Sequence, residues 1–347
     1  MARRNKRPPS RAAAPPPPPP RPAIGGLSGT LLRMAGQAAP VAPDFAAVER
    51  EIEQGGGAPI AQMFGLLRHR EQLARRLAEC RRAAEAEPHS PVRQLLLGDA
   101  LRHMGKRDEA IAAYRRCLEL EPRLAPARHF LAALGAEAVP PAMPHQMVAG
   151  IFDGAAASFE RELVGKLKYQ APALIEKALA PHLPELGRGL DVMDAGCGTG
   201  LCAPYLRRIA RRLDGVDLSA AMIEQATAKV LYDRLGQGDL CDALARMPGD
   251  YDLVVAADVL LYLGDLAPVF AAARTALRPR GLFAFTVERG TGGSYALTPT
   301  GRYTHDGAYV EAEAARAGFA LLERVEDWLR FEEGKPVGGL VYVFARS

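Results

Sequence analysis

The chain has 347 residues, of which 48% are hydrophobic and 24% are charged, and its formal net charge is +4 at pH 7. This length predicts two domains, and the apolar share is sufficient for a sizeable core. The sequence has no run of about 18 apolar residues, so we expect no transmembrane helix. Five cysteines without a C-x-x-C pair favour a reducing compartment, and we expect a cytoplasmic protein.

Residues 1–43 differ in composition from the rest of the chain. They contain seven Lys and Arg residues, no Asp or Glu, and the proline run Pro15–Pro20. Such a segment cannot bury enough apolar surface to offset its ordering entropy, so we predict a disordered basic tail. The rest of the chain then carries a net charge of −3. Because it lacks a basic surface for phosphate backbones, nucleic acid is not an expected partner.

Residues 44–138 show helical patterns. Between Ser90 and Pro122, Gly105 separates two predicted helices, and Tyr114 lies on the apolar face of the second. This segment resembles one tetratricopeptide repeat (TPR), a helix pair of about 34 residues. An ordinary helical hairpin is the alternative. The same spacing predicts a degenerate repeat ending at Pro88, and a single closing helix follows at 126–134.

A proline-rich linker at 139–149 separates this region from a second domain, predicted over 150–347. Apolar residues between Ile151 and Leu167 recur at helical spacing, which predicts one or two amphipathic helices. From Gly189 the sequence is typical of a strand, a glycine loop, a helix over Leu201–Ala210 and a second strand that ends in Asp217. A carboxylate at that strand end can accept hydrogen bonds from both hydroxyls of a ribose.

The glycine loop indicates which ligand is expected. A dinucleotide fingerprint needs a third glycine where Leu201 stands. Asp194, two positions before the first loop glycine, would repel a pyrophosphate and attract the ammonium of a methionyl group. The segment VMDAGCGTG, residues 192–200, resembles motif I of class I S-adenosylmethionine-dependent methyltransferases. That resemblance extends from about Gln170 to the C-terminus.

The resemblance implies an α/β fold with a Rossmann-like, doubly wound, seven-stranded sheet. It implies S-adenosyl-L-methionine as cofactor and no metal, and it places an aromatic lid residue at Tyr169. Met222 is expected either on the adenine face or in the core. The implied cofactor-binding residues are Tyr169, Asp194, Gly196, Gly198, Gly200, Asp217, Leu218, Met222, Asp239, Leu240 and Asp258.

Candidates for the methyl-acceptor side follow from side-chain chemistry. His305 could take a proton near neutral pH, and Arg302 or Arg330 could hold an anionic substrate. No Asn/Asp-Pro-Pro-Tyr and no Pro-Cys pair occurs, so adenine or glutamine amino methylation and pyrimidine carbon-5 methylation by those devices are not expected. The arginines of segment 207–212 are interpreted as one solvated helix face, with an RNA patch as the minority interpretation.

The whole pattern resembles bacterial methyltransferases that carry N-terminal TPR repeats. We therefore expect methyl transfer to an oxygen or nitrogen of a small molecule or protein, with repeats that bind a protein partner or a second copy. Two alternatives stay open: a TPR adaptor whose domain binds the cofactor without turnover, and a nucleotide-dependent oxidoreductase on the same sheet.

Overall fold

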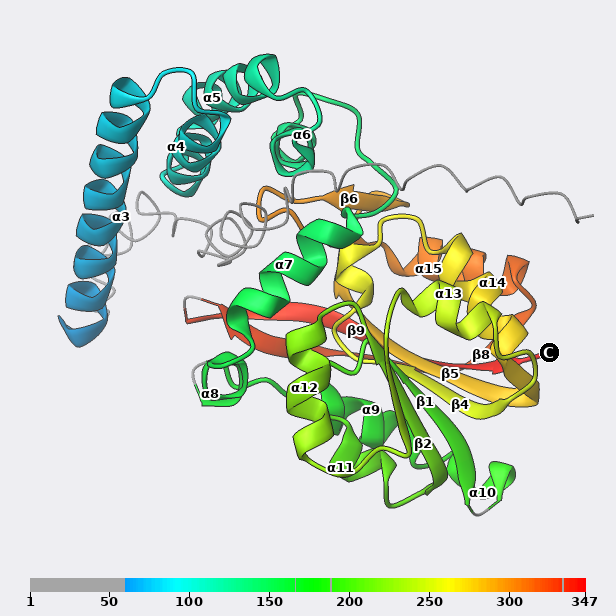
Figure 1. The fold of residues 1–347 in the computed structure, drawn as a ribbon. Coiled ribbons are helices and arrows are strands. Elements are labelled where there is room, and N and C mark those ends of the chain that lie inside the picture. The colour runs from blue at the N-terminus through cyan, green and yellow to red at the C-terminus, as the bar shows by residue number, and fades with distance from the viewer. Residues whose placement is uncertain (1–59, 166, 188, 333) are drawn as a thin grey trace, which may run out of the picture.

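The computed structural model describes residues 60–165, 167–187, 189–332 and 334–347. The predicted tail over residues 1–43 and the predicted start of the helical domain at residue 44 lie outside the described residues. A helical module of four helices sits against an α/β domain (Figure 1). Among the helices that the structure describes, none is long and apolar enough to span a bilayer.

The helical module confirms the predicted helix pair. Its helices are α3 (Ile60–Ala86), α4 (Pro91–His103), α5 (Arg107–Leu120) and α6 (Ala125–Ala133). Gly105 ends the first helix of the pair with a φ of +70°, a left-handed conformation that favours glycine. Gly98 of α4 lies so close to α5 that a Cβ there would be 2.6 Å from the Tyr114 ring. The small residue therefore permits the close approach of the two helices, and α6 forms the predicted closing helix.

The predicted degenerate repeat before Pro88 is wrong. In its place, α3 is one continuous helix of 27 residues. The reason is local: from Ile60 to Glu87 the sequence contains no proline and is rich in Ala, Leu, Arg and Glu, so nothing interrupts the helix.

Four helices connect the module to the sheet, namely α7 (His145–Ala155), α8 (Phe159–Gly165), α9 (Ala171–Leu179) and α10 (Leu183–Leu186). The first two confirm the amphipathic helices predicted before the sheet. Met147 and Val148 of α7 are buried in the same apolar cluster as the core of the helical module. The two parts of the chain thus share a core and are not independent globules.

The sheet confirms the predicted methyltransferase-type α/β fold. Its strands are β1 (Leu190–Ala195), β2 (Ala210–Asp217), β3 (Arg234–Gln237), β4 (Tyr251–Ala256), β5 (Leu277–Arg289), β6 (Tyr295–Leu297), β7 (Tyr303–His305), β8 (Phe319–Glu332) and β9 (Lys335–Arg346). The hydrogen-bonded path is β3-β2-β1-β4-β5-β7-β6, with β9 antiparallel to β5 and β8 antiparallel to β9. Strands β1 to β5 are parallel, so their C-terminal ends share one edge.

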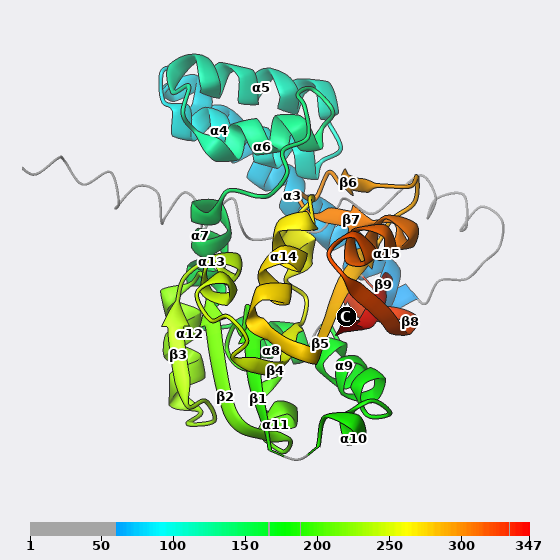
Figure 2. The ribbon, with the colours of Figure 1, turned by 90° about the vertical axis from the view of Figure 1, so that its right-hand side faces the viewer.

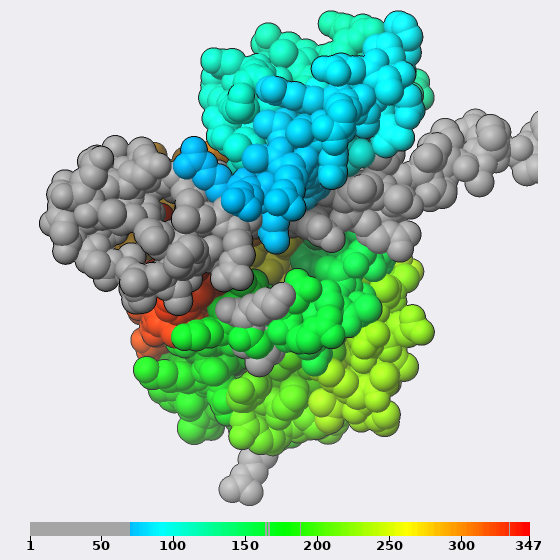
Figure 3. All heavy atoms as spheres, turned by 90° about the vertical axis from the view of Figure 1, so that its left-hand side faces the viewer, coloured from blue at the N-terminus to red at the C-terminus, as the bar shows by residue number. Residues whose placement is uncertain are grey.

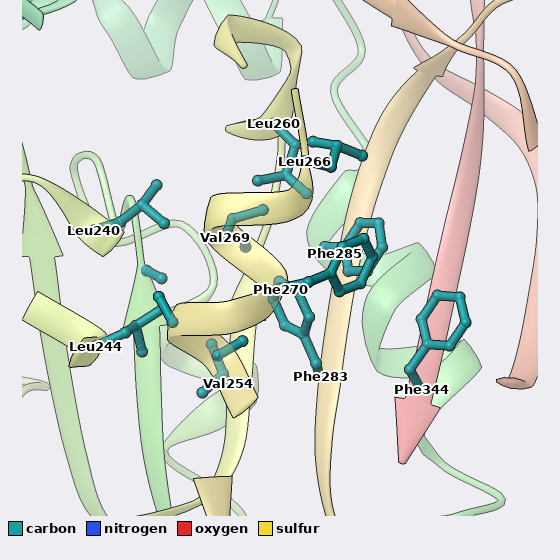
Figure 4. Close-up of a cluster of buried hydrophobic side chains, with 14 of the residues drawn as sticks. Leu240, Leu244, Val254, Leu260, Leu266, Val269, Phe270, Phe283, Phe285 and Phe344 are labelled. Carbon is teal, nitrogen blue, oxygen red and sulfur yellow. The ribbon is translucent and has the colours of Figure 1, made fainter. Parts of the chain in front are cut away.

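Alternating side chains of the strands serve two separate cores. In β4, Val254 and Ala256 face one core while Leu253 and Val255 face the other. The helices α13 (Leu240–Ala245), α14 (Ala267–Ala276) and α15 (Gly307–Arg316) cover the first face, and α9 and α11 (Ala203–Leu206) cover the second (Figure 2). Phe270 of α14 packs against Phe283 and Phe285 of β5 (Figure 4).

The helix predicted over Leu201–Ala210 is much shorter than expected. Helix α11 spans only Ala203–Leu206, and β2 begins at Ala210, which pairs with Leu190 of β1. Residues 207–209 form a turn, so the helix ends four residues before the sheet pairing that begins at Ala210. The arginines do not share a helix face, and each of the four forms an ion pair: Arg207 with Asp233, Arg208 with Glu176, Arg211 with Asp191, and Arg212 with Asp191, Asp214 and Asp250. This arrangement gives no support to an RNA patch.

Candidate functional site

A cavity of about 720 Å³ lies beyond the C-terminal ends of β1, β2 and β4. This volume is within the range of roughly 300–1,000 Å³ found for small-molecule sites. Ten predicted site residues line it, namely Tyr169, Asp194, Gly196, Gly198, Asp217, Leu218, Leu240, Asp258, Arg302 and Arg330. The C-terminal ends of the parallel strands meet at a single sheet edge, which brings together the residues that end or follow β1, β2 and β4.

The glycine loop between β1 and α11 forms one wall of the cavity. Gly196 and Gly198 have φ values of +80° and +53°, which a side chain would strain. A Cβ on Gly196 would come within 2.4 Å of Val259, so no side chain fits there. Around Gly198, by contrast, no atom lies within 4 Å of the position that a Cβ would take. The backbone at Gly198 therefore leaves room for a ligand to lie directly against it.

Asp217 ends β2 and is held by the loop that it faces. Its carboxylate accepts hydrogen bonds from the backbone N–H of Gly198 at 2.9 Å and of Ser219 at 2.8 Å. Burial raises the pKa of Asp217, while these two N–H groups act in the opposite direction. A carboxylate has about four lone-pair sites, so two stay open for hydroxyl groups of a ligand.

Asp194 is a buried carboxylate on the other side of the glycine loop. Its side chain accepts a hydrogen bond from the Tyr232 hydroxyl at 2.7 Å. Burial, together with the nearby Asp217, raises the pKa of Asp194 to about 7, while the hydrogen bond from Tyr232 acts in the opposite direction. No ion pair of Asp194 with a basic side chain occurs among the described residues. A buried, cavity-lining carboxylate without a cationic partner suits a cationic ligand group.

Helices α7 and α8 line the cavity and are held by hydrogen bonds to the loops that follow β1 and β2. Asp153 of α7 accepts a hydrogen bond from the Ser219 hydroxyl at 2.6 Å, and Glu160 of α8 accepts one from the Thr199 hydroxyl at 2.6 Å. Lys229 forms an ion pair with Glu160. Sequence reasoning missed these ties, because side chains far apart in the chain carry no pattern that links them.

Another part of the cavity wall contains a cluster of five charged side chains, of which Glu288 and Arg330 are buried and the other three are partly buried. Arg330 of β8 donates two hydrogen bonds to Asp258, at 2.8 and 2.9 Å, and also pairs with Glu288 and Glu332. Arg302 lies 3.0 Å from Glu288 and 2.7 Å from Glu332. The cluster thus holds three carboxylates against two guanidiniums. Its two arginines are already paired, which does not fit the expected capture of an anion by Arg302 or Arg330.

Asp258 has an unusual backbone conformation at the end of β4. Its φ is +58°, in the left-handed region that non-glycine residues rarely adopt. Burial raises the pKa of its carboxyl group, and Arg330 acts against that shift. A strained residue whose carboxylate lines a cavity indicates a functional position.

Four predicted site residues do not line the cavity, namely Gly200, Met222, Asp239 and His305. Gly200 packs against the Tyr232 ring, and Met222 is fully buried in α12 (Ala220–Ala228), which favours the core interpretation. Asp239 caps α13 by accepting the backbone N–H of Asp242.

His305 is the clearest correction. It is fully buried behind the cavity wall, with Nε2 facing the Gly264 carbonyl at 3.2 Å and its ring stacked on Tyr309. Burial lowers the pKa of His305 to about 4, so the ring is neutral at pH 7 and does not face the cavity. The expectation that His305 takes a proton on the methyl-acceptor side is therefore wrong, because β7 turns this side chain into the protein.

Comparisons with known proteins agree with the fold. A methyltransferase-domain family matches residues 193–285, and a tetratricopeptide-repeat family matches residues 94–124. A ubiquinone biosynthesis O-methyltransferase from Ralstonia nicotianae is 30% identical over 168 residues, which cover 44% of this chain and 69% of that protein. Methyltransferase-like protein 27 from Homo sapiens is 37% identical over 109 residues, covering 30% of this chain and 43% of that protein.

The chain is also similar to parts of solved structures. A 1,6-didemethyltoxoflavin-N1-methyltransferase from Burkholderia thailandensis has 20% sequence identity and a TM-score of 0.45, over 61% of this chain and 93% of that chain. An S-adenosylmethionine-dependent methyltransferase from Mesorhizobium loti has 23% identity and a TM-score of 0.38, over 49% and 98%. The chain spans 55% and 52% of the next two curated relatives, both ubiquinone biosynthesis O-methyltransferases, from Methylobacterium and Albidiferax ferrireducens.

The residues of the cavity fit S-adenosyl-L-methionine. Asp217 has open lone pairs for the ribose hydroxyls, and Asp194 has the charge for the methionyl ammonium. The space against Gly198 accommodates a ligand between the two. Leu201 takes the position of the third glycine that a dinucleotide oxidoreductase would need. The chain therefore belongs to the S-adenosylmethionine-dependent methyltransferases, with a tetratricopeptide repeat placed N-terminal to the catalytic domain.

Proposed function

We propose that this enzyme methylates a hydroxyl or amine of a small molecule that binds in the part of the cavity beyond the glycine loop. The single observation that carries the proposal is the lining of that part of the cavity. Phe152 of α7, Phe159 of α8 and Tyr262 of η1 (Leu260–Tyr262) line it. The ring centroid of Phe152 lies 5.9 Å from that of Phe159 and 5.5 Å from that of Tyr262. A recess between aromatic rings suits a small, largely apolar molecule better than a protein surface.

The charges of the wall favour an acceptor that is not an anion. Three carboxylates face two guanidiniums, so the cluster carries an excess negative charge. Burial acts to raise the pKa of Glu332, but Arg302 and Arg330 outweigh it and keep the group ionised. An acceptor that donates an O–H or N–H hydrogen bond is stabilised beside such a wall, whereas a carboxylate is repelled.

Asp258 is the residue that we propose to orient the acceptor. It lines the cavity at the end of β4, the strand end that in this fold faces the methyl group. When bound, the cofactor supplies an electrophilic methyl carbon, and the protein must place a nucleophile in line with it. The Asp258 carboxylate can accept the acceptor's hydrogen bond, and the aromatic rings around it exclude water.

An oxygen acceptor is the narrower proposal. The relative from Ralstonia nicotianae is named as an O-methyltransferase, and it shares 30% identity with this chain. Two functions compete with this proposal: methyl transfer to a protein side chain, and a role as an adaptor that binds the cofactor without turnover. In both, the TPR would bind a protein. A protein partner for the repeat and the cytoplasmic location also stay proposals, which co-purification and cell fractionation test.

Label transfer distinguishes these functions. The purified full chain is incubated with methyl-tritiated S-adenosyl-L-methionine and either the small-molecule or the protein fraction of a cell extract. We expect label in the small-molecule fraction, stable to mild alkali because an ether or amine does not hydrolyse. Asp258→Asn should lower the rate with unchanged cofactor affinity. Label found only in protein, or released as methanol by alkali, would refute the proposal, and no transfer would favour the adaptor.

A further inference from the structure

The β6–β7 hairpin has little support from the sheet. Strand β7 pairs with β5 through only two residue pairs, Glu288 with Thr304 and Arg289 with His305. Strand β6 pairs with β7 alone, over three residue pairs. Since so short a ladder fixes a hairpin weakly, its position must depend on packing outside the sheet.

The helical module supplies that packing. Arg102 of α4 donates a hydrogen bond to the Pro299 carbonyl at 2.8 Å, and His129 of α6 lies 2.8 Å from the Gly301 carbonyl. Because a carbonyl can only accept, the His129 Nε2 carries the proton. Tyr303 is fully buried in the core of the module. In Figures 2 and 3 the module forms a separate lobe against the sheet domain, and Figure 2 shows β6 and β7 on the side of the module formed by α4 and α6.

The hairpin turn connects this contact to the cavity. Gly301 is buried with a φ of +86°, and a Cβ there would be 2.8 Å from the Phe130 ring of α6. Its two neighbours, Thr300 and Arg302, both line the cavity. Gly301, which contacts the helical module, is therefore flanked in the chain by two residues of the cavity wall.

We propose that the α4–α6 face of the helical module is a docking site for this chain's own β6–β7 hairpin, and that docking fixes Thr300 and Arg302 in the cavity wall. His129 and Gly301 are then positioning residues. The inference rests on the proposed function and deepens it, since it makes the helical module part of the acceptor site. It also assigns the α4–α6 face an occupant within the chain.

Two glycines of similar backbone conformation provide a matched test. Gly301→Ala adds a methyl group that collides with Phe130. Gly292→Ala, at a φ of +100°, adds the same left-handed strain with no atom within 4 Å. A second pair removes or keeps the hydrogen bond: His129→Leu deletes the donor, and His129→Gln restores an N–H that can reach the Gly301 carbonyl. Each variant of the full chain is examined by amide hydrogen exchange, by cofactor titration, and by kinetics with the small-molecule fraction.

We expect Gly301→Ala and His129→Leu to speed exchange at residues 298–303 at least tenfold, and to lower kcat/KM for the acceptor at least fivefold. Cofactor affinity should stay within twofold, and Gly292→Ala and His129→Gln should resemble the wild type. Unchanged exchange in Gly301→Ala, or a parallel loss of cofactor affinity, would overturn the proposal. If the wild type methylates nothing in the small-molecule fraction, the proposed function fails, while the exchange measurement still decides the docking.

Discussion

The role of Asp217 gives the sharpest test of the cofactor site. We expect Asp217→Ala to weaken S-adenosyl-L-methionine binding at least tenfold. In the structure this carboxylate lines the cavity while accepting the N–H groups of Gly198 and Ser219. The variant loses two hydrogen bonds to the ribose, the contact with Gly198 that holds the glycine loop, and the contact with Ser219 before α12.

The expected loss of affinity follows from the negative charge of the Asp217 carboxylate, which accepts the hydrogen bonds. A hydrogen bond to a charged group contributes roughly 1.5–3 kcal/mol, so the loss of two such bonds has an upper range of about 3–6 kcal/mol. Water that enters the variant site recovers part of this, and a net loss of about 1.4 kcal/mol already corresponds to a tenfold change in Kd. We therefore take tenfold as the minimum.

Titration calorimetry with S-adenosyl-L-methionine and S-adenosylhomocysteine measures the effect. Asp306→Ala is the matched control, because Asp306 also accepts two backbone N–H groups, from Gly293 and Ala308, but does not line the cavity. Asp217→Asn, which keeps one carbonyl oxygen, should fall between the wild type and Asp217→Ala. Equal affinities of wild type and Asp217→Ala, or an equal loss in Asp306→Ala, would refute the assignment.

Four further outcomes are expected. Burial raises the pKa of Asp194 to about 7, and the ammonium of the cofactor needs the ionised carboxylate. Calorimetry should therefore show that cofactor affinity falls as the pH drops below about 7, by up to tenfold per pH unit. In Asp194→Asn the affinity should not change over this pH range. Asp153→Ala removes the tie to Ser219 and should speed cofactor release roughly fivefold in stopped-flow experiments, as expected for about 1 kcal/mol; an unchanged rate would exclude a lid. Arg330→Met removes a buried guanidinium that pairs with Asp258, Glu288 and Glu332, and it should cost about 3–5 kcal/mol of unfolding free energy in urea titrations; a cost under about 1 kcal/mol would contradict this. Gly98→Ala pushes a methyl group against Tyr114 and should cost about 1–3 kcal/mol, whereas a Tm equal to that of the wild type would show that the two helices can separate without loss.

Local pattern determined much of this protein. The repeat around Tyr114, the glycine loop after β1 and the acids that end β1 and β2 all follow from spacing, because parallel strands bring their C-terminal residues to one edge. The cofactor is predicted from the resemblance of residues 192–200 to the methyltransferase motif, and Leu201 and Asp194 disfavour a pyrophosphate site.

Other features depended on contacts between distant residues, and only the tertiary structure decided them. The sequence predicts one helix over residues 201–210, but the helix ends at Leu206, a turn follows, and β2 begins at Ala210, where it pairs with β1. His305 is expected on the methyl-acceptor side, but β7 buries it, and burial lowers its pKa. Pairing and burial depend on which elements meet, whereas spacing in the sequence reports only the conformation that a segment favours by itself. The contact of the β6–β7 hairpin with the helical module joins His129 to Gly301, which are 172 positions apart in the chain, so spacing in the sequence does not report it.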